Sequence, residues 1–236
     1  MGDTLRGKPA IQAIKRNYWM LFGILRYLIM IEKIQIPSNG THMDIILSTD
    51  EKKEANFFLE KHGTRSKEFI YLNIGVSVSY KQGPVYQFIA LSNPIPNDTS
   101  LKIILGGGPE DTDRINFINH QISQERVIVD TNRSLIGNCD LINNAKVLVT
   151  PDSGPMHIGF SLKIPTISLF WGTDCNGLIR NELNGPNFCG PLNIDESLSS
   201  VLCGSFFESN KQVDSESLTS KLILASDVWE KILTFL

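Results

Sequence analysis

The residues from Asp152 to His157 read Asp-Ser-Gly-Pro-Met-His and hold the clearest potential for chemistry in this sequence. A largely apolar run at 146–150 precedes them and predicts a strand. Pro155 suits the first position of a helix, because its missing N–H costs nothing there, and Gly154 permits a tight turn between the two elements. We therefore expect a strand, a turn and a helix that begins near Pro155.

The start of that helix is a candidate phosphate site. Unpaired N–H groups of Met156, His157 and Ile158, together with the positive end of the helix dipole, favour an anion. Ser153 adds a hydroxyl donor, and the carboxylate of Asp152 could cap the helix or accept from a sugar hydroxyl. An ordinary cap explains the acid and the serine about as well, and an isolated histidine is commonly a plain surface or core residue. Their occurrence in one strand-to-helix turn favours a binding site.

The elements that must position this turn alternate between short apolar runs and helical segments, which is typical of a parallel, doubly wound α/β sheet. The strands are expected at 69–74, 101–105, 127–129, 146–150 and 166–170. The helices are expected at 49–63, around 114–118, at 135–143, after Gly154 and at 217–236. Ligands bind such a sheet beyond the carboxyl ends of its strands. We expect five residues to converge there: Ser77, Lys81, Glu110, Asp152 and His157.

Composition excludes several classes of protein. With 236 residues, 42% of them hydrophobic, the chain can bury a substantial core. Lys and Arg number 22 against 25 Asp and Glu, without a basic stripe that interleaves aromatics, so nucleic acid is not an expected partner. The four cysteines form no C-x-x-C pair, which favours reduced thiols over a metal site. A bridge between Cys189 and Cys203 is the less favoured alternative.

The apolar run at 18–31 superficially resembles a membrane anchor. Arg26 interrupts it and Glu32 and Lys33 follow at once, which leaves it short of the roughly 20 residues that a spanning helix needs. Its many large apolar side chains predict a helix with neighbours on more than one side, and one of these could lie outside the chain. We expect a cytoplasmic protein, and peripheral attachment at the inner face of the membrane stays open.

The run DSGPMHIGFSLKIPTISLFWGT, residues 152–173, resembles the heptosyltransferases of glycosyltransferase family 9. In that family Asp, Ser or Thr, Gly, two variable residues and His lead into a helix, a Pro, an apolar strand and a Gly-Thr. Residues 106–110, Gly-Gly-Gly-Pro-Glu, resemble the family's glycine-rich turn closed by Glu, and residues 77–81 resemble its first phosphate-binding loop. The resemblance extends through most of 69–194.

This resemblance implies that Ser77 and Lys81 contact the donor diphosphate and that Glu110 holds the ribose hydroxyls. Four residues would line the pyrophosphate and the sugar: Asp152, Ser153, Gly154 and His157. Each residue also has a reading without function. Lys81 could be a solvated loop lysine, and Glu110 could be a first-turn residue whose negative charge interacts favourably with the helix dipole. A lysine and a helix N-terminus can stabilise a leaving nucleoside diphosphate without a metal. We therefore expect no metal and no cofactor besides an ADP-sugar donor substrate.

The resemblance also implies the GT-B architecture of two facing Rossmann-like halves, in which the N-terminal half binds the acceptor and supplies the catalytic carboxylate. The 68 residues before Phe69 are too few for such a half. We expect 1–68 to hold a linker and helices left from it and 69–194 to form the nucleotide-sugar-binding domain, the C-terminal half. Residues 195–236 should form a loop and a helix packed on that domain. The catalytic base stays unassigned.

The predicted function is transfer of a sugar from a nucleoside-diphosphate donor, ADP-heptose by resemblance, to a lipopolysaccharide-type acceptor. The resemblance implies inversion at the anomeric carbon without a metal. We expect the isolated chain to be inactive, with a second chain or domain supplying the N-terminal half. Two alternatives stay open: a nucleotide-sugar-binding module without catalysis, and another doubly wound nucleotide-sugar enzyme such as an epimerase.

Overall fold

The computed structural model describes residues 32–36, 45–122, 124–171, 196–204 and 223–236. The expected helix at 18–31 and the beginning of the one expected at 217–236 lie outside these residues. So do Cys175 and Cys189. No helix in the described part is long and apolar enough to cross a membrane.

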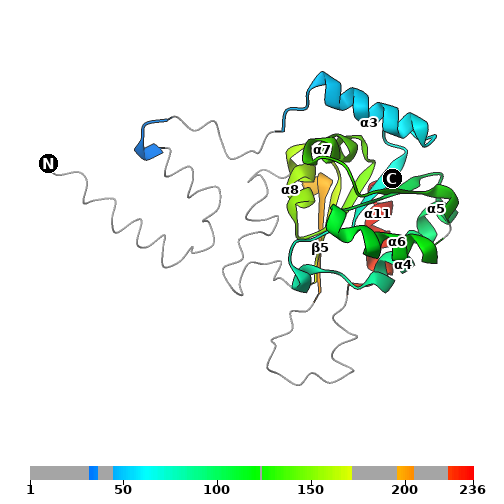
Figure 1. Ribbon diagram of the computed structural model, residues 1–236. Coiled ribbons are helices and arrows are strands. Elements are labelled where there is room, and N and C mark those ends of the chain that lie inside the picture. The colour runs from blue at the N-terminus through cyan, green and yellow to red at the C-terminus, as the bar shows by residue number, and fades with distance from the viewer. Residues whose placement is uncertain (1–31, 37–44, 123, 172–195, 205–222) are drawn as a thin grey trace, which may run out of the picture.

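The core of the protein is a six-stranded sheet in which every neighbouring pair of strands is parallel (Figure 1). The strands are β1 (Phe69–Asn73), β2 (Lys102–Gly106), β3 (Val127–Asp130), β4 (Val147–Pro151), β5 (Thr166–Phe170) and β6 (Ser199–Cys203). Their order across the sheet is β3-β2-β1-β4-β5-β6. The chain therefore builds outward from β1 in one direction, crosses back to β4 and builds outward in the other, which confirms the doubly wound fold.

Helices cover both faces of this sheet (Figure 1). One face carries α4 (Val85–Ser92), α5 (Pro94–Asp98), α6 (Thr112–Gln121) and α11 (Ala225–Leu233). The other carries α3 (Thr49–Lys61), α7 (Leu135–Asn144) and α8 (Gly154–Ser161). Short 3-10 turns are η1 (Ser79–Lys81), η2 (Pro109–Asp111), η3 (Gln124–Arg126) and η4 (Glu196–Leu198).

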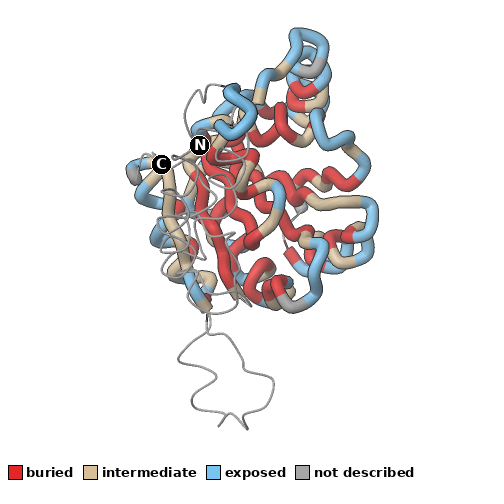
Figure 2. The backbone as a smooth tube through the Cα atoms, turned by 90° about the vertical axis from the view of Figure 1, so that its left-hand side faces the viewer, coloured by how far each residue is buried: buried red, intermediate tan, exposed pale blue. Residues whose placement is uncertain are grey.

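Side chains alternate between the two faces of each strand, so the strands contribute to the hydrophobic core on both sides of the sheet. In β1, Ile70 and Leu72 pack under α4 and α6, whereas Phe69 and Tyr71 pack under α3 and α7. All five residues of β1 are buried, as are those of β4 and β5. Figure 2 shows that the buried residues gather in the centre of the described structure. A strand buried on both faces reads as a continuous apolar run, which is why the sequence predicted these strands well.

The five expected strands and the helices at 49–61, 112–121, 135–144 and 154–161 are confirmed. Gly63 follows α3 with φ of +60°, a backbone conformation that favours glycine and ends the helix as expected. The helices α4 and α5 and the strand β6 were not expected from the sequence. β6 pairs with β5 at the edge of the sheet and is only half-buried over most of its length, so it carries a weak apolar signal.

The two cysteines of the described part differ. Cys139 is buried on α7 and is not disulfide-bonded. Cys203 is disulfide-bonded, and its partner lies outside the described residues. The expectation of reduced thiols is therefore wrong at Cys203.

Candidate functional site

The candidate site lies beyond the carboxyl ends of β1 and β4, the two strands at which the winding of the sheet reverses. The chain leaves β1 toward β2 on one side and leaves β4 toward β5 on the other. The two connections therefore diverge at the position where ligands usually bind an open α/β sheet. The expected phosphate-binding loop follows β1, and the Asp-Ser-Gly turn follows β4.

Lys81 and Asp152 meet at this position. The Lys81 Nζ lies 2.7 Å from the Asp152 Oδ2, and the side chains are only 10% and 3% exposed. Lys81 stands at the end of η1, whereas Asp152 directly follows β4. Lys81 is thus not the solvated loop lysine of the alternative reading. A charge-assisted hydrogen bond between buried partners holds the ammonium in one place.

The hydroxyl of Ser153 points into the protein rather than along α8. Ser153 is the N-cap residue, yet its side chain makes no cap hydrogen bond. Its Oγ instead accepts from the Asn73 Nδ2 at 3.2 Å and lies 3.2 Å from the Thr150 Oγ1. The reading of Ser153 as an ordinary side-chain cap is therefore wrong, and Asn73 ties the end of β1 to this turn.

The free donors at the start of α8 differ from those expected. The Met156 N–H donates to the Ser153 carbonyl at 3.1 Å, so the expectation that it is unpaired is wrong. The helix begins at Gly154, one residue earlier than expected, which moves the first N–H groups to Ser153 and Gly154. Beyond its chain neighbours and its own helix backbone, a Cβ at Gly154 would meet no atom of the described residues within 4 Å. The first turn of α8 thus opens onto free space that a ligand could fill.

The remaining predicted residues lie along the same edge of the sheet. Ser77 is exposed in the loop after β1, and Glu110 is exposed in η2, four residues after the end of β2. His157 lies half-buried in the first turn of α8. The strands β2, β1 and β4 are parallel neighbours, so their carboxyl ends lie at the same end of the sheet. The predicted residues are gathered at that end. Their individual roles toward a donor stay predictions.

Three further residues shape this edge without a signal in the sequence: Asn73, Asp111 and Arg114. The Asp111 Oδ2 accepts from the Gly108 N–H at 3.0 Å and so fixes the glycine-rich turn. Burial raises the pKa of Asp111, and the Gly108 hydrogen bond opposes this rise. Burial lowers the pKa of Arg114, which the Asp111 carboxylate opposes. Only the fold reveals the contacts of Asn73 and Arg114, because they join separate loops, whereas the Asp111 hydrogen bond lies within its own turn.

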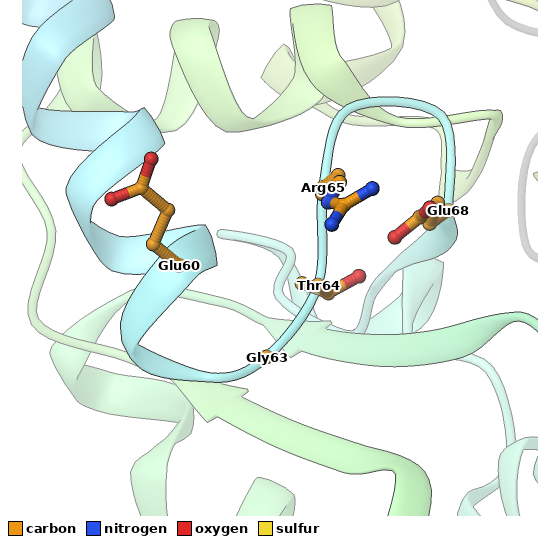
Figure 3. A pocket seen from close by; sticks show the side chains of 5 residues that line it. All are labelled: Glu60, Gly63, Thr64, Arg65 and Glu68. Carbon is orange, nitrogen blue, oxygen red and sulfur yellow. The ribbon is translucent and has the colours of Figure 1, made fainter.

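A cavity of about 500 Å³ lies at the end of the sheet opposite to the carboxyl ends of the strands, and it is not the predicted site. Figure 3 shows the residues that line it: Glu60, Gly63, Thr64, Arg65 and Glu68. Glu68 directly precedes β1, so the cavity lies at the amino end of that strand. Two carboxylates against one guanidinium also disfavour a diphosphate there. The described residues contain no group of three or more His, Cys, Asp or Glu side chains placed to hold a metal.

The sequence model of glycosyltransferase family 9 (heptosyltransferase) matches residues 12–178. This chain belongs to glycosyltransferase family 9. The expected resemblance is therefore confirmed. The match begins well before residue 69, and the three expected domain ranges stay predictions.

Known members of this family are similar to the chain in sequence and fold. Lipopolysaccharide heptosyltransferase 1 of Campylobacter coli is 26% identical over 159 residues, 63% of this chain and 46% of that protein. The crystal structure of the glycosyl transferase family 9 from Veillonella parvula DSM 2008 aligns with a TM-score of 0.69 and 23% identity, over 89% of this chain and 58% of that one. The E. coli ADP-heptose LPS heptosyltransferase II aligns with a TM-score of 0.60 and 20% identity, over 81% and 53%.

These alignments confirm the Rossmann-like α/β fold shared with GT-B glycosyltransferases. The chain spans about half the length of the family members it matches. Features of whole heptosyltransferases therefore do not pass to it by similarity alone.

Proposed function

We propose that the loops beyond the carboxyl ends of β1 and β4 bind the nucleoside diphosphate of an ADP-heptose donor, and that the chain works in transfer of the heptose to a lipopolysaccharide-type acceptor. The observation that carries the proposal is the buried Lys81 ammonium, held by Asp152 beside the open first turn of α8. Family membership supports it. A similar E. coli heptosyltransferase structure, with a TM-score of 0.55 and 20% identity, contains ADP.

The proposed mechanism uses positive potential instead of a metal. An ammonium has three N–H donors, and Asp152 takes one of those on Lys81. The others can serve a phosphate, while the N–H groups at Ser153 and Gly154 serve the diphosphate from the helix side. As the anomeric bond breaks, charge accumulates on the leaving diphosphate, and these fixed donors stabilise it. The exposed carboxylate of Glu110 would accept from the ribose hydroxyls.

Asp152 also explains why the lysine is needed. A buried carboxylate alone would repel the diphosphate, and the ammonium offsets that repulsion. Removal of Lys81 would thus withdraw a phosphate donor and the positive charge that lies between the donor substrate and the Asp152 carboxylate. We therefore expect this side chain to dominate donor affinity.

The proposed transfer also requires a base within reach of the acceptor hydroxyl and a surface that holds the acceptor in line. His157 lies in the first turn of α8, beside the proposed phosphates, where it suits a donor contact better than proton abstraction. We propose that the base and the acceptor surface come from an N-terminal half on another domain or chain, and that transfer inverts the anomeric carbon.

Calorimetric titration with ADP tests the binding site. We expect binding in the presence of a chelator, and at least about tenfold weaker binding by Lys81→Met, since hydrogen bonds to charged groups are among the stronger ones. Lys102→Met is the matched control, because it removes the same charge at the start of β2, on the opposite edge of the sheet. Absence of ADP binding, or binding that requires a divalent metal, would contradict the proposal.

Incubation with ADP-heptose, with and without a lipopolysaccharide-core acceptor, separates the alternative functions. We expect the isolated chain to bind the donor without transfer, and to leave its sugar unchanged when no acceptor is present. Transfer at about one turnover per second or faster would contradict the need for another half. Conversion of the sugar without an acceptor would indicate an epimerase instead.

A further inference from the structure

One side chain holds both ends of the loop that carries Lys81. This loop, residues 74–83, leaves β1 and contains η1. From α6, the Arg114 Nη1 donates to the Ile74 carbonyl at 3.4 Å, and the Arg114 Nη2 donates to the Gly83 carbonyl. A single guanidinium therefore joins the beginning of the loop, Ile74, to its end, Gly83, which lies 9 residues later in the sequence.

The guanidinium itself is well held. It lies 5.6 Å from the centroid of the Phe88 ring on α4 and is half-buried. Such a planar cation stacks on an aromatic face while its edge donates to two acceptors. Arg114 therefore fixes the loop relative to both α4 and α6.

The end of the loop is closed from the other side by Trp171. A methyl group at Gly83 would overlap the Trp171 ring, so the Gly83 backbone packs directly on the indole. The same ring packs against Phe88, with 5.4 Å between the ring centroids. Near the beginning of the loop, Gly75 packs on the Asp111 carboxylate just as closely. The loop is thus confined on several sides by residues outside the predicted donor contacts.

We propose that Arg114 is a positioning residue, which clasps loop 74–83 and thereby keeps Lys81 against Asp152, where the donor diphosphate binds. The clasp follows from the contacts of Arg114, and its effect on the donor rests on the proposed function. Lysine cannot replace the arginine here, because an ammonium lacks the planar fork that reaches two carbonyls at once. A role of charge alone would survive Arg114→Lys, whereas the clasp would not.

A double-mutant cycle on ADP affinity tests whether Arg114 acts through Lys81. We expect Arg114→Lys to raise the Kd of ADP about tenfold in the otherwise unchanged protein. In the Lys81→Met background the same substitution should have little further effect, because the group that it positions is gone. Equal, additive effects in the two backgrounds would overturn the inference. Arg126→Lys is the matched control, since the Arg126 Nη1 also donates to a loop carbonyl, that of Thr99, away from the donor site.

Amide hydrogen exchange of the ligand-free protein tests the clasp without ADP. The N–H groups of Lys81 and Gln82 donate to the carbonyls of Val78 and Ser79 within η1. Arg114→Lys should speed their exchange about tenfold or more, while the amides of β4 stay protected. Unchanged exchange in η1 would overturn the inference even if ADP binds. If the unmodified protein binds no ADP, the proposed function fails, and this measurement still decides the clasp.

Discussion

Breaking the ion pair between Lys81 and Asp152 should strongly destabilise the protein. Lys81→Met keeps most of the aliphatic volume and removes the ammonium, which leaves the Asp152 carboxylate buried without that cation. The side chains are 10% and 3% exposed, so water cannot fully replace the lost partner. Removal of one member of a buried ion pair typically costs about 3 to 5 kcal/mol. We take about 3 kcal/mol, because the lysine retains slight contact with solvent.

This loss is large relative to the stability of a typical domain, which is about 5 to 15 kcal/mol. With a urea dependence of about 2 kcal/mol per molar, the midpoint of unfolding should fall by about 1.5 M. Asp152→Asn should cost a similar amount, since it leaves the ammonium buried without its carboxylate. The double variant, Lys81→Met with Asp152→Asn, should lose less than the sum of the two single variants.

Urea unfolding of the unmodified protein, the two single variants and the double variant, followed by circular dichroism, measures these values. Lys102→Met again serves as the control for loss of a lysine, although it also removes the bond that the Lys102 Nζ donates to the His62 carbonyl. Strictly additive losses in the double variant, or a loss below about 1 kcal/mol for Lys81→Met, would refute the reasoning, because such a value is typical of an exposed pair.

Two further predictions concern the neighbouring loops. Gly83→Ala should force the loop away from the Trp171 ring and cost about 1 to 3 kcal/mol; thermal unfolding measures this, and an unchanged midpoint would contradict the packing. Burial raises the pKa of Asp111. The Glu110 carboxylate raises this pKa further, whereas Arg114 lowers it. The ionised form of Asp111 therefore costs folding stability at neutral pH. Asp111→Asn should therefore be more stable than the unmodified protein at about pH 7, and this advantage should shrink as the pH falls through the raised pKa. An advantage that grows toward low pH in urea unfolding would contradict this sign.

The sequence by itself determined the elements that have a strong local signal. The strands β1, β4 and β5 are buried on both faces, so each appears as an apolar run between polar loops. The turn at 151–154 was equally readable, because proline restricts the backbone and glycine widens the conformations open to it, each through its own covalent structure. Regular alternation of strands and helices then implied the doubly wound sheet and a common edge for the polar loops.

Only the tertiary structure decided which of those polar groups meet. Lys81 and Asp152 are 71 positions apart, and no local pattern shows that they form a buried pair. Arg114 reaches Gly83 across 31 positions, and β6 becomes a strand through its pairing with β5. Burial and partnership depend on the way separate elements pack, whereas periodicity and backbone preference act within a few neighbouring residues. The local turn was therefore visible in the sequence, and the contacts that hold its partners in place were not.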